Sequence, residues 1–175
     1  FHHIYGFKRE QAGWIMSCIF IGLAVGGPFA GWLSDRFARR KPFMLMSVSV
    51  CFLVLMVVLL VPSLNIIPMT ILFFIYGFFS VGVALSYAVA GELHSSAVSG
   101  VSMAFTNMMS IAIGAILQPV LGWLLDLYLS HASGTKTSIV YAYTHVMWLL
   151  PICLLLSFLC VVFLPEIKLK GENSD

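Results

Sequence analysis

Charged residues are scarce in this 175-residue sequence and make up only 9% of it. An ordinary soluble domain carries about 25% charged residues. Here the charges fall in clumps, which leave uncharged runs at 11–34, 42–91, 93–125 and 137–165. A soluble core needs polar helix faces that alternate with apolar ones, and these runs do not supply them. The scarcity of charge therefore excludes a soluble globular domain.

Motifs that support catalysis are also missing. His94, His131 and His145 are scattered and lack H-E-x-x-H or any other ligand spacing, so we expect no metal site. The spans contain no nucleophile–base pair, and the chain has no nucleotide-binding loop, which argues against an enzyme and an ATP-driven pump. The four cysteines lie inside apolar runs and are interpreted as buried apolar residues, not disulfides. We expect no cofactor and no nucleic-acid partner.

Long apolar stretches are what the sequence does contain. A helix needs about 20 apolar residues to cross the hydrocarbon core of a membrane. The fifty-residue run is divided by P-S-L-N-I-I-P, because two prolines and an asparagine interrupt a helix. The predicted spans are 13–34, 43–61, 69–90, 99–125 and 139–164. We therefore predict an all-α, polytopic membrane protein with five transmembrane helices, a single transmembrane domain over 1–175, and the lipid bilayer as a partner.

Basic residues predict the orientation, because cytoplasmic loops carry an excess of Lys and Arg. If the loop 35–42 is cytoplasmic, six basic residues lie inside and three lie outside. Those inside are Arg36, Arg39, Arg40, Lys41, Lys168 and Lys170, and those outside are Lys8, Arg9 and Lys136. We therefore predict an outer N-terminus and a cytoplasmic tail at 165–175. The expected localisation is the plasma membrane, which we interpret as a bacterial inner membrane.

The first and fourth spans share one pattern, although they cross the membrane in opposite directions. Both end in P-x-x-G-W-L-x-D, at 28–35 and 119–126, so the five shared residues are each 91 positions apart. Similar helices of opposite direction are typical of the inverted repeats in secondary transporters. The pattern predicts a three-helix repeat, in which the counterpart of the third span would precede residue 1.

Glycine is absent from the second and fifth spans and frequent in the other three. Glycines four residues apart, such as Gly22/Gly26 and Gly27/Gly31, let two helix backbones approach closely. We therefore expect spans one, three and four to be central, and spans two and five to be peripheral and to face lipid.

The loop after the first span resembles the signature of the major facilitator superfamily, Gly-x-Leu-x-Asp-Arg-x-Gly-Arg-Arg/Lys. In G-W-L-S-D-R-F-A-R-R the matching residues are Gly31, Leu33, Asp35, Arg36, Arg39 and Arg40, and Ala38 stands in place of the second glycine. The preceding Y-G-F-K-R-E-Q-A-G-W-I-M-S also resembles the family's approach to this helix. The resemblance covers the whole chain, and it implies twelve helices in two six-helix halves around a central cavity.

The resemblance also indicates which half this chain represents. The family's first half usually carries an arginine in its fourth helix, and the matching span here has none. A polar tail, P-E-I-K-L-K-G-E-N-S-D, follows shortly after the last span. Both features favour helices eight to twelve of the C-terminal half, with the N-terminal half of the same transporter as a missing partner.

Two polar stripes supply candidates for the substrate cavity, because positions i, i+3/i+4 and i+7 share one helix face. The candidates are Asn107, Ser110 and Gln118 in the fourth span and Tyr76, Ser80 and Tyr87 in the third. An amide that faces lipid would leave its donors unsatisfied, so both stripes should face protein or water. Two interpretations stay open: the stripes line a translocation cavity, or they bond and pack against neighbouring helices.

The signature loop supplies a second group of candidates, Gly31, Asp35, Arg36, Arg39 and Arg40. The basic residues act as a topology signal. The resemblance implies that Asp35 is a cytoplasmic gate latch, which contacts the positive N-terminal end of a helix in the other half. The alternative is a polar helix-end residue at the membrane interface.

These features favour secondary active transport of a small solute by alternating access, and they do not favour an enzyme. The alternative is a non-transporting membrane scaffold or receptor built on the same fold, although a scaffold has no reason to keep polar stripes on central helices. No charged residue lies in mid-span, so neither an ionic substrate nor a coupling carboxylate is assigned to this chain. The further expected partners are a small-molecule solute and the missing half.

Overall fold

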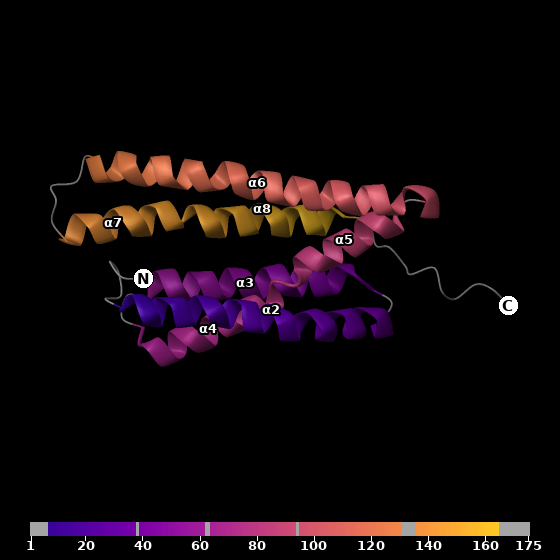
Figure 1. Ribbon diagram of the computed structural model, residues 1–175, viewed down its shortest axis with the longest axis horizontal. Helices are drawn as coiled ribbons and strands as arrows, with labels where there is room; N and C mark the ends of the chain where they lie inside the picture. Colours follow the sequence, from indigo (N-terminus) through magenta and orange to yellow (C-terminus); the bar gives the residue numbers. More distant parts are fainter. Residues whose placement is uncertain (1–6, 38, 62–63, 94, 131–135, 165–175) are drawn as a thin grey trace.

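The computed structural model describes residues 7–37, 39–61, 64–93, 95–130 and 136–164 (Figure 1). Every regular element within these ranges is an α-helix. The helices are α2 (Arg9–Phe37), α3 (Lys41–Leu60), α4 (Ile66–Phe79), α5 (Gly82–Glu92), α6 (Ser96–Ser130), α7 (Lys136–Met147) and α8 (Leu149–Phe163).

Five helical segments are long and apolar enough to cross a membrane. They are Arg9–Ser34, Lys41–Leu60, Ile66–Glu92, Ser96–Ser130 and Ile139–Phe163. The third consists of α4 and α5, and the fifth consists mainly of α7 and α8. The predicted fold class, an all-α polytopic membrane protein with five transmembrane helices, is confirmed.

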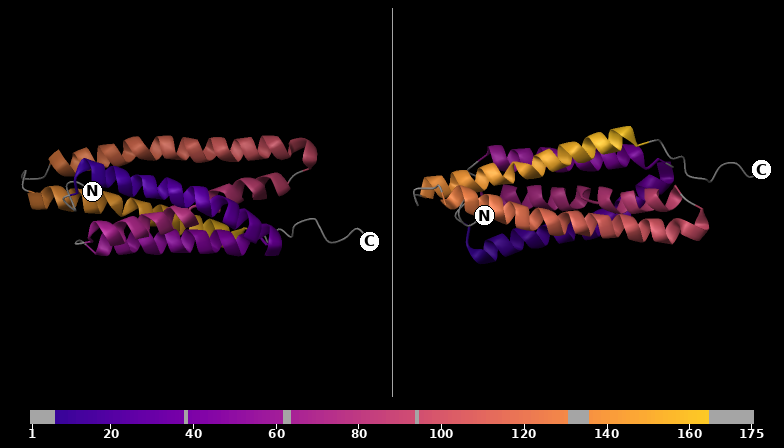
Figure 2. Two further views of the ribbon diagram at one scale, coloured as in Figure 1. Left: turned by 60° about the horizontal axis from the view of Figure 1, so that its bottom comes forward. Right: turned by 90° about the horizontal axis from the view of Figure 1, so that it is seen from above.

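The five segments lie side by side and alternate in direction along the chain (Figures 1 and 2). Helices α2 and α6, which share P-x-x-G-W-L-x-D, therefore run in opposite directions. The α2–α3 connection, the start of α6 and the end of α8 lie at one end of the bundle. The end of α3 and the end of α6 lie at the other.

Glycine brings α2 and α4 into direct backbone contact. A Cβ added to Gly22 would collide with the carbonyl oxygen of Phe74, and one added to Gly26 would collide with that of Phe78. In return, a Cβ on Gly77 of α4 would collide with the carbonyl oxygen of Ile19. Small residues allow this approach in membranes, where close packing replaces the hydrophobic effect as a driving force. The expectation for the Gly22/Gly26 pair agrees with these contacts.

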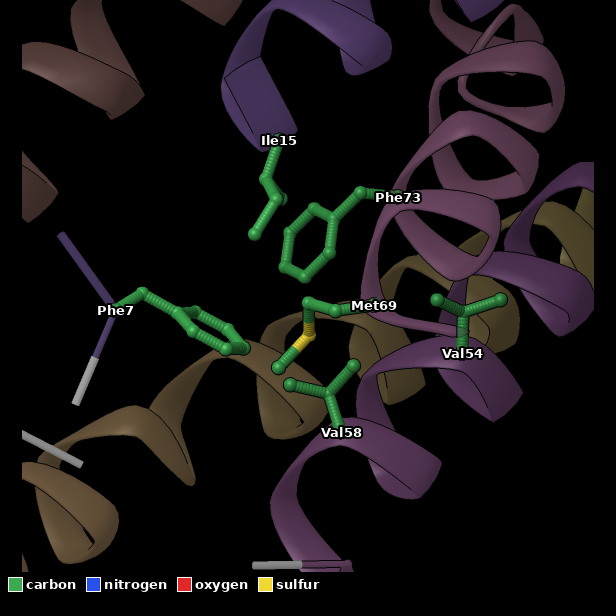
Figure 3. Close-up of a cluster of buried hydrophobic side chains, with 6 residues drawn as sticks. All are labelled: Phe7, Ile15, Val54, Val58, Met69 and Phe73. Atoms are coloured by element: carbon green, nitrogen blue, oxygen red, sulfur yellow. The ribbon is translucent and has the colours of Figure 1, made fainter. Parts of the chain in front are cut away.

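Two apolar clusters hold the bundle, one toward each end. The first joins α2, α3 and α4 beside the N-terminal end of α2, and its members are Phe7, Ile15, Val54, Val58, Met69 and Phe73 (Figure 3). The second joins α3, α5 and α8 at the opposite end, and its members are Met44, Leu85, Val89 and Val161. Helix α3 belongs to both clusters and is therefore packed near both of its ends.

The third and fifth spans are each interrupted near the middle. Between α4 and α5, the Ser80 hydroxyl donates to the carbonyl of Gly77 at 2.8 Å, and Ser80 and Val81 lie outside both helices. Serine bonds of this kind and nearby glycines commonly bend helices. In the fifth span, Pro151 lacks the amide hydrogen that would continue the ladder from α7 into α8.

The distribution of burial differs from the expectation based on glycine. Helix α3, which contains no glycine, buries six residues against its neighbours. Over all of Ser96–Ser130, which the structure describes, α6 buries none. The physical reason is that a glycine allows a neighbouring helix to come close but does not by itself bring one there. Added Cβ atoms on Gly114 and Gly122 of α6 would meet nothing within 4 Å. The same holds for Gly27 and Gly31 on α2.

Candidate functional site

A pocket of about 300 Å³ lies in the middle of the bundle, among α3, α4, α5, α6 and α8. It includes Met44 and Val161 of the second apolar cluster, and it reaches Tyr76, which packs against the first. The break between α4 and α5 forms part of its wall, because Ser80 and Gly82 both line it. The interruption of the third span is therefore what shapes this pocket.

The predicted cavity residues divide into two groups. Tyr76, Ser80 and Ser110 come together in the pocket, although they belong to two different spans. Asn107 and Gln118 do not line it and are exposed on α6. The two stripes of the sequence therefore do not form a single continuous site.

Tyr87 belongs to neither group. Its side chain is half-buried on α5 and does not line the pocket. One helical turn before it, Val83 does line the pocket. The polar stripe of the third span therefore leaves the pocket between these two positions.

Three of the pocket hydroxyls donate to carbonyl oxygens of their own spans. Ser80, Ser86 and Ser110 donate to the carbonyl oxygens of Gly77, Val83 and Thr106 at 2.8, 2.6 and 2.9 Å. Bonds from serine to a carbonyl three or four residues earlier use the only hydroxyl proton and leave the oxygen lone pairs. These three serines can therefore accept hydrogen bonds from a molecule in the pocket.

Sequence reasoning missed several residues of this pocket. Ser47 and Cys51 lie on the same face of α3, one turn apart, and Ser157 lies on α8. Both helices were expected to be peripheral because they lack glycine. The i, i+4 spacing of Ser47 and Cys51 is a signal that could have identified the pocket-facing side of α3.

Within the signature loop, Arg40 connects three helices. Its guanidinium donates to the Ser34 hydroxyl of α2 at 2.9 Å and forms an ion pair with Glu92 of α5 at 2.8 Å. The Arg40 side chain is only 12% exposed, and Ser34 is fully buried. This network joins the end of α2, the start of α3 and the end of α5.

The other signature residues do not join this network in the described contacts. Arg36 is exposed and lies over the ring of Trp32 at 5.5 Å, a cation–π contact. Arg39 is exposed, and Gly31 is half-buried with open space around it. Asp35 lies in the last turn of α2, and its side chain is outside the described part of the structure.

Lys41 forms a second connection at the same end of the bundle. Its ammonium group donates to the carbonyl oxygens of Val162 and Leu164 at 2.7 Å each. A cation at a helix C-terminus satisfies carbonyls that have no partner within the helix and interacts favourably with the helix dipole. Lys41 therefore caps α8 from the first residue of α3.

His145 lies beside an aromatic ring and not beside metal ligands in the described part of the chain. His145 packs its ring against Tyr141, with ring centroids 3.7 Å apart, and its Nδ1 lies 2.9 Å from the Tyr141 carbonyl oxygen. His94 and His131 lie outside the described residues. Among the described side chains, no group of three or more His, Cys, Asp or Glu is arranged to hold a metal ion.

Comparison with known proteins identifies the family. The model of the Major Facilitator Superfamily matches residues 1–174, which is nearly the whole chain. Searches of curated proteins and of solved structures gave no match. The match agrees with the signature loop and with the five apolar helices described above. This chain belongs to the Major Facilitator Superfamily, a superfamily of membrane transporters, and is a multi-pass membrane protein.

Proposed function

We propose that the chain forms part of a secondary transporter that carries a small solute by alternating access. The observation that carries this proposal is the exposed polar face of α6. Asn107 and Gln118 are exposed there, with Gly114 between them. A side-chain amide in hydrocarbon costs several kcal/mol, of the order of 2–7, when it finds no partner. Such a face fits a water-filled cavity better than it fits lipid.

Under this proposal, the second wall of the cavity comes from another helical bundle. The chain would represent helices eight to twelve, and the N-terminal half of the transporter would face α2 and α6. The open space at Gly27 and Gly31 supports this arrangement, because that side of α2 is also partly uncovered. The basic residues at 36–41 would lie on the cytoplasmic side of the plasma membrane, the inner membrane in a bacterium.

Solute uptake by the transporter with both halves tests the role of the exposed polar face. We expect Gln118→Leu to lower the rate of uptake at least about fivefold, because it removes about 1 kcal/mol of polar contact. Ile116→Leu is the matched control, since Ile116 is an exposed apolar residue of the same helix. Equal uptake by the two variants, at equal amounts in the membrane, would contradict the cavity assignment.

Liposomes that contain only this 175-residue chain provide the second test. Alternating access moves one bundle against another around a shared site, so one bundle should not transport. We expect no solute-specific uptake. Specific uptake that persists when the chain is shown to be monomeric would refute the two-bundle proposal.

A further inference from the structure

The pocket among α3, α4, α5, α6 and α8 differs from the proposed transport cavity in one respect: five helices of this chain form a half-enclosed hollow by themselves. A second bundle is not needed to form it. Its volume of about 300 Å³ is at the lower end of the range for pockets that hold small molecules. The pocket is therefore large enough for a small ligand in the isolated chain.

The lining restricts the charge of a ligand. None of the lining residues is Lys, Arg, His, Asp or Glu. An ion placed among them would lose its hydration without gaining a counter-charge, which is unfavourable in a membrane. A ligand of this pocket is therefore uncharged.

The lining also restricts the shape and polarity of a ligand. Most of the wall is aliphatic or aromatic, from Met44, Val48, Phe79, Val83, Leu154 and Val161. Six hydroxyl groups also line it, and three of them, on Ser80, Ser86 and Ser110, offer only lone pairs because their protons bond carbonyls of their own spans. A mainly apolar molecule with a hydrogen-bond donor matches both properties.

A route from the bilayer leads toward the pocket. A second hollow, of about 270 Å³, lies between α3 and α8 and is lined almost entirely by apolar side chains, including Leu53 and Leu155. These two leucines are 60% and 50% exposed, so the hollow faces the surrounding lipid. Val48 and Leu154 line both hollows and separate them. The two hollows therefore adjoin at these side chains.

We propose that this pocket binds a small, uncharged, mainly apolar alcohol taken from the bilayer, whose single hydroxyl proton is donated to the oxygen of Ser110. This site is additional to the transport cavity of the proposed function. Ser80 lies in the α4–α5 break, Ser86 lies within α5, and Ser110 belongs to α6. A bound alcohol thus hydrogen-bonds to the fourth span and packs against the third across the pocket.

Photolabelling of the 175-residue chain in lipid nanodiscs tests this proposal. The probe is a benzyl alcohol that carries a photoreactive diazirine, and the matched control probe is its methyl ether, which has the same apolar body without the donor. We expect saturable labelling of peptides from α3, α5 and α8 by the alcohol, with unlabelled benzyl alcohol as competitor. We expect the ether to label these peptides about 2- to 10-fold less, the effect of one lost hydrogen bond.

Variants locate the site more closely. Ser110→Ala should lower saturable labelling about 2- to 10-fold, and Ser157→Leu should abolish it by filling the pocket. Ser17→Ala is the matched control, because the Ser17 hydroxyl also donates to its own helix, to the Gly13 carbonyl at 3.0 Å, but is exposed on α2. Circular dichroism verifies that each variant remains helical.

Two outcomes would overturn the proposal without the use of any variant. One is equal labelling by the alcohol and the ether, and the other is non-saturable labelling spread over lipid-facing residues such as Phe20 and Ile67, which are each 70% exposed. Neither outcome bears on transport, which is measured with both halves present. Conversely, failure of the Gln118→Leu experiment would leave this pocket unaffected.

Discussion

Helices α2 and α6 share the P-x-x-G-W-L-x-D pattern near their ends, but they differ in how closely they pack against the other helices. Helix α2 is pressed against α4 through Gly22, Gly26 and Gly77. Helix α6 buries no side chain along its whole described length. A shared sequence pattern therefore does not produce a shared packing environment in this chain.

The reason lies in the residues that surround the shared pattern. At the offset of 91 residues, Ile113 and Leu117 of α6 stand where α2 has Gly22 and Gly26. Branched side chains at these positions prevent the backbone contact that α2 makes. The shared pattern thus repeats the end of the helix, and the packing surface before it is not repeated.

One side of both helices is nevertheless alike. Gly27 and Gly31 of α2 correspond to Gln118 and Gly122 of α6, and all four positions are uncovered or partly uncovered. Under the proposed function, this side of each helix would meet the other half of the transporter. The comparison separates a packed side, which differs between the helices, from an open side, which they share.

The largest effect is expected from two adjacent glycines of α2. Gly26→Ala places a methyl group against the Phe78 carbonyl, and the two backbones have to separate, at a cost of about 1–3 kcal/mol or more. Gly27→Ala meets nothing within 4 Å, and should raise the free energy of unfolding by about 0.5–1 kcal/mol, because alanine favours helix. Unfolding of the detergent-solubilised chain by added dodecyl sulfate measures both. Equal effects at the two positions would show that α2 and α4 are not in backbone contact.

The next effect, of comparable or smaller size, is expected at the end of α2, where Arg40 connects Ser34 to Glu92 of α5. Helix α6 has Leu125 in place of Ser34 and cannot make this connection. Arg40→Met removes the bonds to Ser34 and Glu92 and should lower the free energy of unfolding by about 1–3 kcal/mol. Arg39→Met removes the same charge from an exposed position and should change it by less than about 0.5 kcal/mol. A double-mutant cycle with Glu92→Gln isolates the ion pair. A coupling energy indistinguishable from zero would show that the Arg40–Glu92 ion pair does not contribute to stability.

The smallest effect is expected from the two aspartates of the repeat. Under the latch hypothesis, Asp35→Asn removes attraction to a helix N-terminus, worth about 0.3–1 kcal/mol, and should raise the inward-open population about two- to fivefold. Asp126→Asn is the matched control, because Asp126 occupies the same place in α6 and is exposed. Labelling of Gln118→Cys from each side of the membrane, in the transporter with both halves, measures the population. Identical labelling in the Asp35→Asn and Asp126→Asn variants would contradict the latch hypothesis and indicate that Asp35 is only a polar residue at the membrane interface.

The sequence predicted the fold class because charge and proline placement alone delimit five apolar segments. It also predicted the α2 side of the closest helix contact, since Gly22 and Gly26 are four residues apart. It did not predict the break at Ser80–Val81, because that stretch remains apolar and its bend depends on local hydrogen bonds. Nor did it predict that α6 would be the least covered helix.

The candidate site was predicted only in part for a related reason. Helical periodicity places Tyr76 and Ser80 on one face, and Ser110 on one face of another helix, but it does not show which faces meet. The pairing of Arg40 with Glu92 spans 52 residues of sequence and follows from the arrangement of three helices. Pairings of this kind require the tertiary structure.

The cap that Lys41 places on α8 has a consequence for the order of assembly during synthesis. Its acceptors, the carbonyl groups of Val162 and Leu164, are made 121 and 123 residues later in the chain. At about 5–20 residues per second, the ribosome needs roughly 6 to 25 seconds to reach them. During this interval the ammonium group has none of its final acceptors at the membrane surface. This end of the bundle is therefore completed only when α8 docks beside α3.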